Sequence, residues 1–289
     1  MLTTATIESA LRFALDEDAP WGDITGDTFI PATASAQAVL SAREAGIFAG
    51  GEVFARAFSL VDASVEVDVT AADGESFSPG DTLATVSGPA RAVLRAERIA
   101  LNFCQRMSGI ATHTRAFVDA AATNSAGMSV RIADTRKTTP GLRAFEKHAV
   151  RCGGGHNHRF GLSDAVMVKD NHLAVLAGEK ADVSAAIRSA RAQLSHTTTI
   201  EVEVDRLEQI GPVLDGGADI IMLDNFSLAD LRTGVELIAG RAVVEASGNV
   251  TLDTVADIAA TGVDVISSGA LTHSVRAIDL GLDLVLDAG

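Results

Sequence analysis

Residues 199–225 read TIEVEVDRLEQIGPVLDGGADIIMLDN, and this stretch decides the fold class. Two short runs rich in apolar and β-branched residues, 199–205 and 218–225, flank an amphipathic run at 206–214. Strands buried on both faces are typical of parallel sheets, and a helix between two such strands makes a βαβ unit. The stretch therefore predicts one repeat of a parallel α/β fold.

The same alternation continues on both sides of this repeat. Four further candidate strands lie at 129–134, 164–170, 241–247 and 263–268, and further helical patterns lie at 182–194, 228–238 and 252–260. Each candidate strand ends in charged or small hydrogen-bonding residues, and in α/β barrels the ligand site forms where the strands finish. Six strands with polar ends predict a parallel α/β barrel that is incomplete, because a full barrel has eight strands.

The first 115 residues show a different pattern. An amphipathic helix is expected near 6–16, then an acidic turn with helix-capping Asp at 17–27, short strands at 37–42, 65–70 and 82–88, and a long helix from 89 to 121. This pattern predicts an α+β sandwich-like domain over 1–115, followed by a barrel domain over 116–273. The amphipathic tail, 274–289, is expected to pack on the N-terminal domain.

Composition excludes several classes of function. Tyr is absent and there is one Trp, which argues against an aromatic stacking surface for single-stranded nucleic acid. The net charge of −15 disfavours binding to a phosphate backbone. No apolar run reaches the length of a membrane span, the first residues do not resemble a signal peptide, and two cysteines make no disulfide framework. A cytoplasmic protein with reduced thiols is expected.

One segment, 134–172, is rich in cations although the chain as a whole is acidic. It holds four acids against seven basic residues: Arg136, Lys137, Arg143, Lys147, Arg151, Arg159 and Lys169. Four of the seven histidines also fall within it. Cations gathered on an anionic protein indicate an anionic ligand, so we expect a polyanionic small molecule.

A series of short motifs runs in order along nearly the whole chain: Glu97-Arg98, Ser108-Gly109, Asp134-Thr135-Arg136-Lys137, Gly153-Gly154-Gly155, Asn157-His158-Arg159, Lys169-Asp170-Asn171-His172, Glu201-Val202-Glu203, Leu223-Asp224-Asn225, Ser247-Gly248-Asn249 and Ser268-Gly269. This series resembles the quinolinate phosphoribosyltransferases, also called carboxylating nicotinate-nucleotide pyrophosphorylases. The resemblance implies a pentosyltransferase of NAD biosynthesis. Its reaction converts quinolinate and phosphoribosyl pyrophosphate into nicotinate mononucleotide, pyrophosphate and CO₂.

The resemblance also implies roles for residues of the site. Four residues would hold the quinolinate carboxylates: Arg136, His158, Arg159 and Lys169. Lys137 would contact pyrophosphate, and Arg98 would come from the partner subunit of a homodimer. Lys137, Lys169, Glu201 and Asp224 are the expected catalytic residues.

Other residues would serve the sugar donor. Glu201 and Asp224 would bind ribose hydroxyls and the Mg²⁺ that the donor carries. The 5′-phosphate would lie in a cradle formed by Ser247, Gly248, Asn249, Ser268 and Gly269, with His273 beside it. No organic cofactor is expected, because the glycosylated ring nitrogen is cationic and stabilises the electrons that CO₂ leaves behind.

Some assignments have alternatives. We expect only one of Glu201 and Glu203 to face the barrel mouth and favour Glu201, with a structural ion pair as the alternative for either. Lys169 could form a Schiff base, but the neighbouring cations favour anion binding. Zinc at Cys152, His156 and His158 is not expected, and Arg143, Lys147 and Arg151 fit a solvated or intersubunit helix face.

Two rival functions stay open. One is a related phosphoribosyltransferase for a different acid, such as the molybdenum-transport-associated paralogues of the family. The other is a non-catalytic phosphosugar sensor, which Glu201 and Asp224 disfavour because a sensor needs no charge-stabilising acids.

Overall fold

The structure, a computed structural model, describes residues 2–124, 130–169, 172 and 182–285. The chain divides into two units. The first comprises Met1–Arg115, Thr138–Gly154 and Leu271–Gly289, and the second comprises Ala116–Lys137 and Gly155–Ala270. Among the described residues, no helix is both long enough and apolar enough to cross a bilayer.

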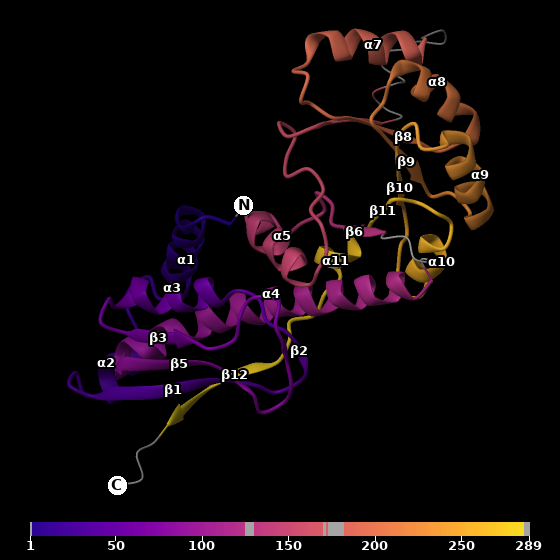
Figure 1. Cartoon of the computed structure of the whole chain (residues 1–289). Helices are drawn as coiled ribbons and strands as arrows, with labels where there is room; N and C mark the ends of the chain where they lie inside the picture. The colour runs from indigo at the N-terminus through magenta and orange to yellow at the C-terminus, as the bar shows by residue number, and fades with distance from the viewer. Residues whose placement is uncertain (1, 125–129, 170–171, 173–181, 286–289) are drawn as a thin grey trace. The chain divides into compact units, whose positions relative to one another are not determined.

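The first unit contains a four-stranded antiparallel sheet in the order β12-β1-β5-β3 (Figure 1). The strands are β1 (Ser35–Ala42), β3 (Glu66–Val69), β5 (Thr82–Pro89) and β12 (Leu280–Val285). The C-terminal strand β12 pairs with β1, with Leu280 opposite Ala42. The separate antiparallel sheet of the expected α+β class is thus confirmed.

The unit contains α1 (Thr4–Asp18), α2 (Ile24–Phe29), α3 (Gly51–Val61), α5 (Arg143–Cys152) and most of α4 (Ala90–Asn124). The first two helices begin at polar caps that the sequence provides. Thr3 caps α1, and Asp23 of the acidic turn caps α2 by accepting a hydrogen bond from the Gly26 N–H. A short two-stranded sheet pairs β2 (Gly46–Ile47) with β4 (Ser76–Phe77).

Helix α5 carries the three regularly spaced cations, but they do not form one solvated face. Lys147 is only 3 % exposed, so the expectation of a solvated face is wrong at this position. The helix buries residues on several sides, including Phe145, Glu146 and Val150. The four-residue spacing alone could not reveal this burial.

The second unit contains a six-stranded, all-parallel sheet in the order β6-β11-β10-β9-β8-β7. The strands are β6 (Arg131–Ala133), β7 (Val166–Val168), β8 (Ile200–Val204), β9 (Ile220–Asp224), β10 (Val243–Ser247) and β11 (Val265–Ser267). Within the described part of the chain, β6 and β7 are the end strands, so the sheet is an open barrel. The expected incomplete barrel is therefore confirmed.

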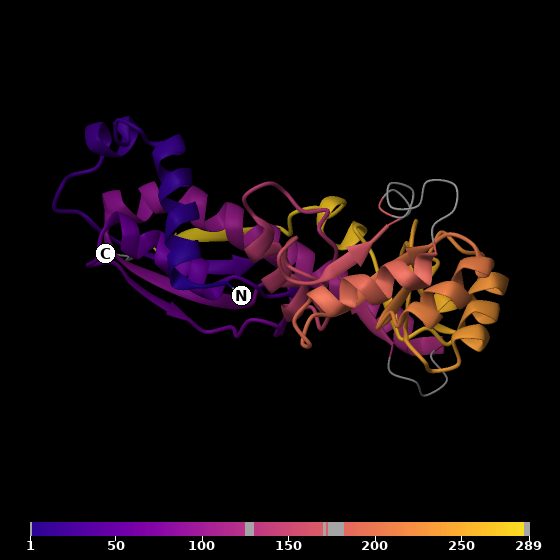
Figure 2. The same ribbon diagram turned by 90° about the horizontal axis from the view of Figure 1, so that it is seen from above.

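Helices α7 (Val183–Gln193), α8 (Ile210–Gly216) and α9 (Leu228–Ile238) lie along the outer side of this sheet (Figure 1, and from above in Figure 2). Asp182 caps α7, and Ser227 caps α9. The pattern at 206–214 becomes a 3₁₀ turn, Leu207–Gln209, before α8, in which Pro212 occupies the tolerant first turn. Helix α10 (Val255–Ala259) is shorter than the helix expected at 252–260. All these helices leave the carboxyl ends of the strands open.

Candidate active site

A cavity of about 510 Å³ lies at the carboxyl ends of the parallel strands. A cavity of this size suits a small-molecule ligand. Its walls come entirely from the second unit: Thr135, Arg136, Lys137, His158, Arg159, Met167, Lys169, Glu203, Met222, Asp224, Asn225, Ser247, Gly248, Asn249 and Ser267. Strand ends and the loops that follow them therefore build the site, as the parallel barrel requires.

Buried Asp134 anchors the loop that brings His158 to the cavity. The residue follows β6 directly and is fully buried. Its Oδ1 accepts a hydrogen bond from the His158 N–H at 2.9 Å, and its Oδ2 accepts one from Asn157 Nδ2 at 2.6 Å. His156 also pairs with β6 through its backbone. These contacts hold the loop at the end of the strand.

The same two segments, the one after β6 and the loop that contains His158, supply three cations of the cavity wall. Arg136 and Lys137 come just after Asp134, where the Thr135 hydroxyl accepts a hydrogen bond from the Lys137 N–H at 3.0 Å. The Arg159 guanidinium donates to the Ala165 carbonyl at 3.0 Å. Burial, followed by the proximity of Arg136, lowers the pKa of Arg159. Gathering like charges in this way costs free energy, and a bound anion would offset that cost.

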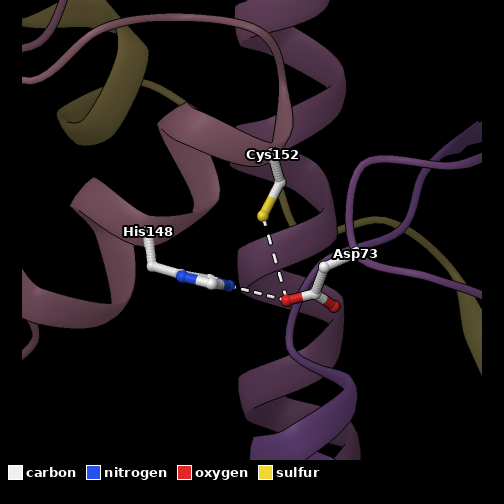
Figure 3. Close-up of side chains that lie close together, drawn as sticks. All are labelled: Asp73, His148 and Cys152. Carbon is white, nitrogen blue, oxygen red and sulfur yellow. Dashed lines mark hydrogen bonds and ion pairs between the residues drawn. The ribbon is translucent and has the colours of Figure 1, made fainter. Parts of the chain in front are cut away.

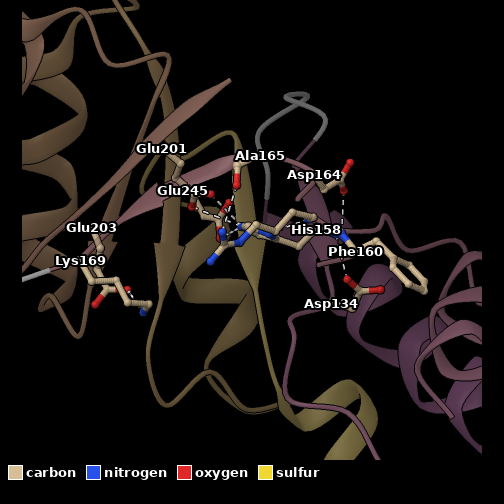
Figure 4. A network of polar contacts seen from close by, with 10 residues as sticks. Asp134, His158, Phe160, Asp164, Ala165, Lys169, Glu201, Glu203 and Glu245 are labelled. Carbon is tan, nitrogen blue, oxygen red and sulfur yellow. Dashed lines mark hydrogen bonds and ion pairs between the residues drawn. The ribbon is translucent and has the colours of Figure 1, made fainter. Parts of the chain in front are cut away.

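Lys169, at the end of β7, forms an ion pair with Glu203 of β8 inside the cavity (Figure 4). The Lys169 N–H also donates to His172 Nδ1 at 3.0 Å. Residues Asp170 and Asn171 of the same motif lie outside the described residues. Lys169 can thus reach a ligand while Glu203 balances its charge.

Glu203, not Glu201, is the glutamate of β8 that lines this cavity. Only one of the two faces the barrel mouth, as expected, but the preference for Glu201 is wrong. Both side chains point to the barrel interior, because residues two apart on a strand share a face. Glu201 lies two residues earlier on the same face, nearer the amino end of β8, and is 3 % exposed. It borders a second hollow of about 520 Å³, which is lined by residues at the amino ends of the strands.

A buried cluster of His158, Glu201 and Glu245 forms below the cavity (Figure 4). His158 Nε2 lies 3.0 Å from Glu201 Oε2 and 3.6 Å from Glu245 Oε1. Burial, and then the charge of Glu201, raise the pKa of Glu245 to about 7. Glu245 therefore keeps its proton in mildly acidic solution, where an ordinary glutamate is ionised.

The hydrogen bonds of His158 identify its tautomer. Its Nδ1 accepts a hydrogen bond from the Arg159 N–H at 2.7 Å, so this nitrogen carries no proton. The neutral ring must then carry its proton on Nε2, where Glu201 accepts it. Because Nδ1 already accepts the Arg159 N–H, the proton on Nε2 cannot move to Nδ1 and leave Nε2 to a metal, so the cluster is a poor metal site despite its three donors.

The far wall of the cavity has the backbone of an anion cradle. Gly248 has φ +94°, and its neighbours in space, Asn225 and Asn249, have φ 57° and 50°. Asn249 Nδ2 donates to Asn225 Oδ1 at 3.0 Å, and Asn225 N–H donates to the Ser247 carbonyl at 2.9 Å. Such left-handed turns at strand ends direct backbone N–H groups into a concave anion site. Asp224 borders the same wall.

Two expected members of the cradle have other partners. The Ser268 N–H donates to the Ala133 carbonyl at 3.0 Å, and its hydroxyl donates to the Val250 carbonyl at 3.0 Å. Neither Ser268 nor Gly269 borders the cavity, whereas Ser267 does. Ser268, just after β11, is therefore bonded both to the end of β6 and to the loop that follows β10, which contains the cradle.

The second unit thus brings together nine of the residues that the sequence indicated: Arg136, Lys137, His158, Arg159, Lys169, Asp224, Ser247, Gly248 and Asn249. Arg98 and His273 belong to the first unit. Sequence reasoning missed Asn225 and Glu245. The left-handed tendency of an Asn after a strand could have indicated the former.

Comparisons with known proteins agree with this geometry. Two family models match the chain: "Quinolinate phosphoribosyl transferase, N-terminal domain" over 23–108 and "Quinolinate phosphoribosyl transferase, C-terminal domain" over 110–283. A nicotinate-nucleotide pyrophosphorylase [carboxylating] from Mycobacterium leprae is 42 % identical, with 98 % of this chain and 100 % of the relative covered. A probable enzyme of the same name from Bacillus subtilis is 42 % identical over 93 % of this chain and 90 % of the relative.

Solved structures show the same likeness. The crystal structure of NadC from Streptococcus pyogenes has a TM-score of 0.91 at 42 % identity, with 99 % of each chain covered. A nicotinate-nucleotide pyrophosphorylase from Pyrococcus furiosus, at 17 % identity and a TM-score of 0.70, shares the fold over 99 % of this chain and 77 % of its own.

Proposed function

The chain belongs to the quinolinate phosphoribosyltransferase family, and from this premise we propose how its barrel cavity performs the reaction. Its activity is that of the carboxylating nicotinate-nucleotide pyrophosphorylases to which it is similar. It joins quinolinate to the ribose of phosphoribosyl pyrophosphate, forms nicotinate mononucleotide for NAD biosynthesis, and releases pyrophosphate and CO₂. The observation that carries the assignment to this cavity is the convergence of four cationic side chains with Glu203 and Asp224 on one hollow.

Quinolinate binds among Arg136, Arg159 and Lys169 in this proposal. The guanidinium groups suit bidentate contact with planar carboxylates, and Lys169 supplies a point charge. A direct contact of His158 with a carboxylate would require one ring nitrogen to leave its present partner. We therefore propose that His158 forms the neutral floor of the quinolinate site.

Phosphoribosyl pyrophosphate binds along the other wall. Lys137 contacts the pyrophosphate, and the loop of Ser247, Gly248 and Asn249 receives the 5′-phosphate. Carboxylate oxygens are suitable ligands for Mg²⁺, and Glu203 and Asp224 both border this wall. These two residues would hold the Mg²⁺ that the sugar donor carries, which would neutralise charge on the departing pyrophosphate. Glu201, the other expected ligand, would support the site from below through His158.

The charges on the reacting groups change during the reaction, and the side chains of the cavity stabilise them. As pyrophosphate departs, positive charge grows on the ribose ring, and preorganised carboxylates stabilise it. After the ring nitrogen is glycosylated, the bond between the ring and its adjacent carboxylate breaks. The electron pair stays on that ring carbon, where the cationic nitrogen stabilises it until a proton from solvent replaces CO₂. We propose that no organic cofactor takes part.

We further propose that a homodimer completes the site, with Arg98 supplied by the partner subunit. Arg98 lies on α4 next to Glu97, in the first unit. An additional guanidinium would complement the dianionic substrate. A cytoplasmic location is also proposed, which the free thiols of Cys104 and Cys152 support.

Mixing two inactive variants tests the shared site. Arg98→Ala and Lys137→Ala should each lose activity while keeping the fold. Mixed dimers should recover roughly a quarter of the wild-type activity, because half the dimers are mixed and each has one complete site. No recovery after proven subunit exchange would refute the contribution of the partner's arginine. Omission of Mg²⁺ should abolish turnover in the wild-type protein, and a metal-independent rate would refute the proposed metal role.

A further inference from the structure

We propose that Asp73, His148 and Cys152, in the first unit, form a binding site for a divalent transition metal of the zinc type. The site lies on α5 and on the loop that precedes β4. Nothing in the phosphoribosyl transfer described above uses these side chains.

The three donor atoms converge (Figure 3). His148 and Cys152 are four residues apart on α5, so they project from the same side of the helix. His148 Nε2 lies 2.6 Å from Asp73 Oδ2, and Cys152 Sγ lies 3.9 Å from the same oxygen. One donor atom from each residue falls within 4.8 Å of the other two.

Asp73 is held so that one carboxylate oxygen points at the two helix residues, where a metal ion would take the place of the protons that His148 and Cys152 now share with it. Its Oδ1 accepts hydrogen bonds from the Gly50 and Gly51 N–H groups at 2.9 and 3.0 Å. Its Oδ2 is the atom that faces His148 and Cys152. Hydrogen bonds from the second layer that orient a ligand in this way are typical of metal sites.

The loop and the helix are packed closely enough to keep this arrangement. Gly74 has φ +93°, and a Cβ there would lie 3.2 Å from the Cys152 carbonyl oxygen. The backbone that follows Asp73 is therefore in close contact with the end of α5. The ligands thus belong to a regular helix and to a loop fixed against it.

Their chemistry selects the class of ion. Thiolate, imidazole and carboxylate together suit Zn²⁺ or Co²⁺, whereas Mg²⁺ and Ca²⁺ prefer oxygen ligands alone. Tetrahedral ligands around zinc stand roughly 3.3 Å apart, so His148 and Asp73 need to separate by less than about 1 Å. Three protein ligands leave the fourth position to water.

Cobalt provides a direct test, because a thiolate bound to Co²⁺ gives a charge-transfer band in the near ultraviolet. Full-length protein freed of metal with a chelator should bind one equivalent of Co²⁺ with this band, and Zn²⁺ should displace it. Cys152→Ser should abolish the band. His148→Gln and Asp73→Asn should each weaken binding at least about tenfold. Circular dichroism and the quinolinate reaction, whose site lies elsewhere, check that each variant is folded.

Cys104 is the matched control, because it is the other cysteine of the chain and is fully buried. Cys104→Ser should keep the cobalt band. Absence of a band in the wild-type protein would overturn the site. So would a band lost in Cys152→Ser but unchanged in both His148→Gln and Asp73→Asn, since a single thiol would then account for it.

Discussion

His158 Nε2 donates a hydrogen bond to Glu201 Oε1 at 3.3 Å, while Nδ1 of the same ring accepts one from the Arg159 backbone. The pair places a neutral imidazole between the cationic cavity and a buried carboxylate. Because both ring nitrogens are engaged, the ring is oriented before any ligand arrives. The floor of the cavity is therefore preorganised by a contact that no substrate makes.

Glu245 should make stability depend on pH. Its folded pKa is raised from 4.5 to about 7 by burial and by Glu201, so between these values the native state binds more protons than the unfolded chain. The free energy of unfolding should therefore fall as pH rises from 4.5 to about 7. Glu245→Gln removes this loss and should be more stable than the wild type by about 1–3 kcal/mol near pH 8.

Denaturant unfolding of both proteins at several pH values measures the difference. At pH values below 4.5 the two should differ little, because the wild-type carboxyl is then protonated in both states. Equal stabilities across the whole range would show that the buried pair does not carry the assigned protonation.

Arg136 should be needed as arginine and not only as a positive charge. Arg136→Lys keeps the charge but loses the planar fork that matches a carboxylate. We expect the KM for quinolinate to rise roughly 10- to 100-fold, with the KM for phosphoribosyl pyrophosphate nearly unchanged. Steady-state kinetics with each substrate varied in turn will test this. An equal rise for both substrates would contradict the assignment of Arg136 to quinolinate.

Gly248→Ala should damage the phosphate cradle. The residue has φ +94°, and a Cβ would lie 2.3 Å from Asn225 Oδ1 and 2.8 Å from the Asn225 nitrogen. The loop must shift, so the KM for phosphoribosyl pyrophosphate should rise at least about tenfold, with about 1–3 kcal/mol of stability lost. Gly211→Ala, on α8 in open space, is the control and should change neither property. A wild-type KM in Gly248→Ala would refute the cradle.

The two glutamates of β8 should behave differently. Glu203→Gln removes a carboxylate from the cavity wall and should lower kcat by at least about 100-fold. Glu201→Gln removes the buried acceptor of His158, so we expect chiefly lost stability and a higher KM for quinolinate. Comparing kcat, KM and the unfolding free energy of both variants tests the assignment. A larger loss of kcat in Glu201→Gln would reverse the two roles.

Much of the barrel could be predicted because each strand and its polar end are local in sequence. The pattern at 228–238 matches α9, and the run at 218–225 contains β9. The cluster below the cavity could not be predicted in the same way. Glu245 meets Glu201 and His158 only through the curvature of the sheet and the register of β10, which sequence periodicity does not specify.

The choice between Glu201 and Glu203 shows a different limit. The two-residue period places both on the inner face, but not their depth in the barrel. That depth depends on how β8 pairs with β9, where Glu203 lies opposite Met222 and Glu201 opposite Ile220. Likewise, Asp73 is 75 residues from His148, so no local motif could indicate their contact.

The most direct test of the central claim follows CO₂ and nicotinate mononucleotide together in one reaction of purified protein with quinolinate, phosphoribosyl pyrophosphate and Mg²⁺. The cavity described above predicts equal amounts of the two products, and negligible turnover when nicotinate replaces quinolinate, because the second carboxylate is then missing. Nucleotide formed without CO₂, or equal turnover of nicotinate, would contradict a site built for the doubly acidic pyridine.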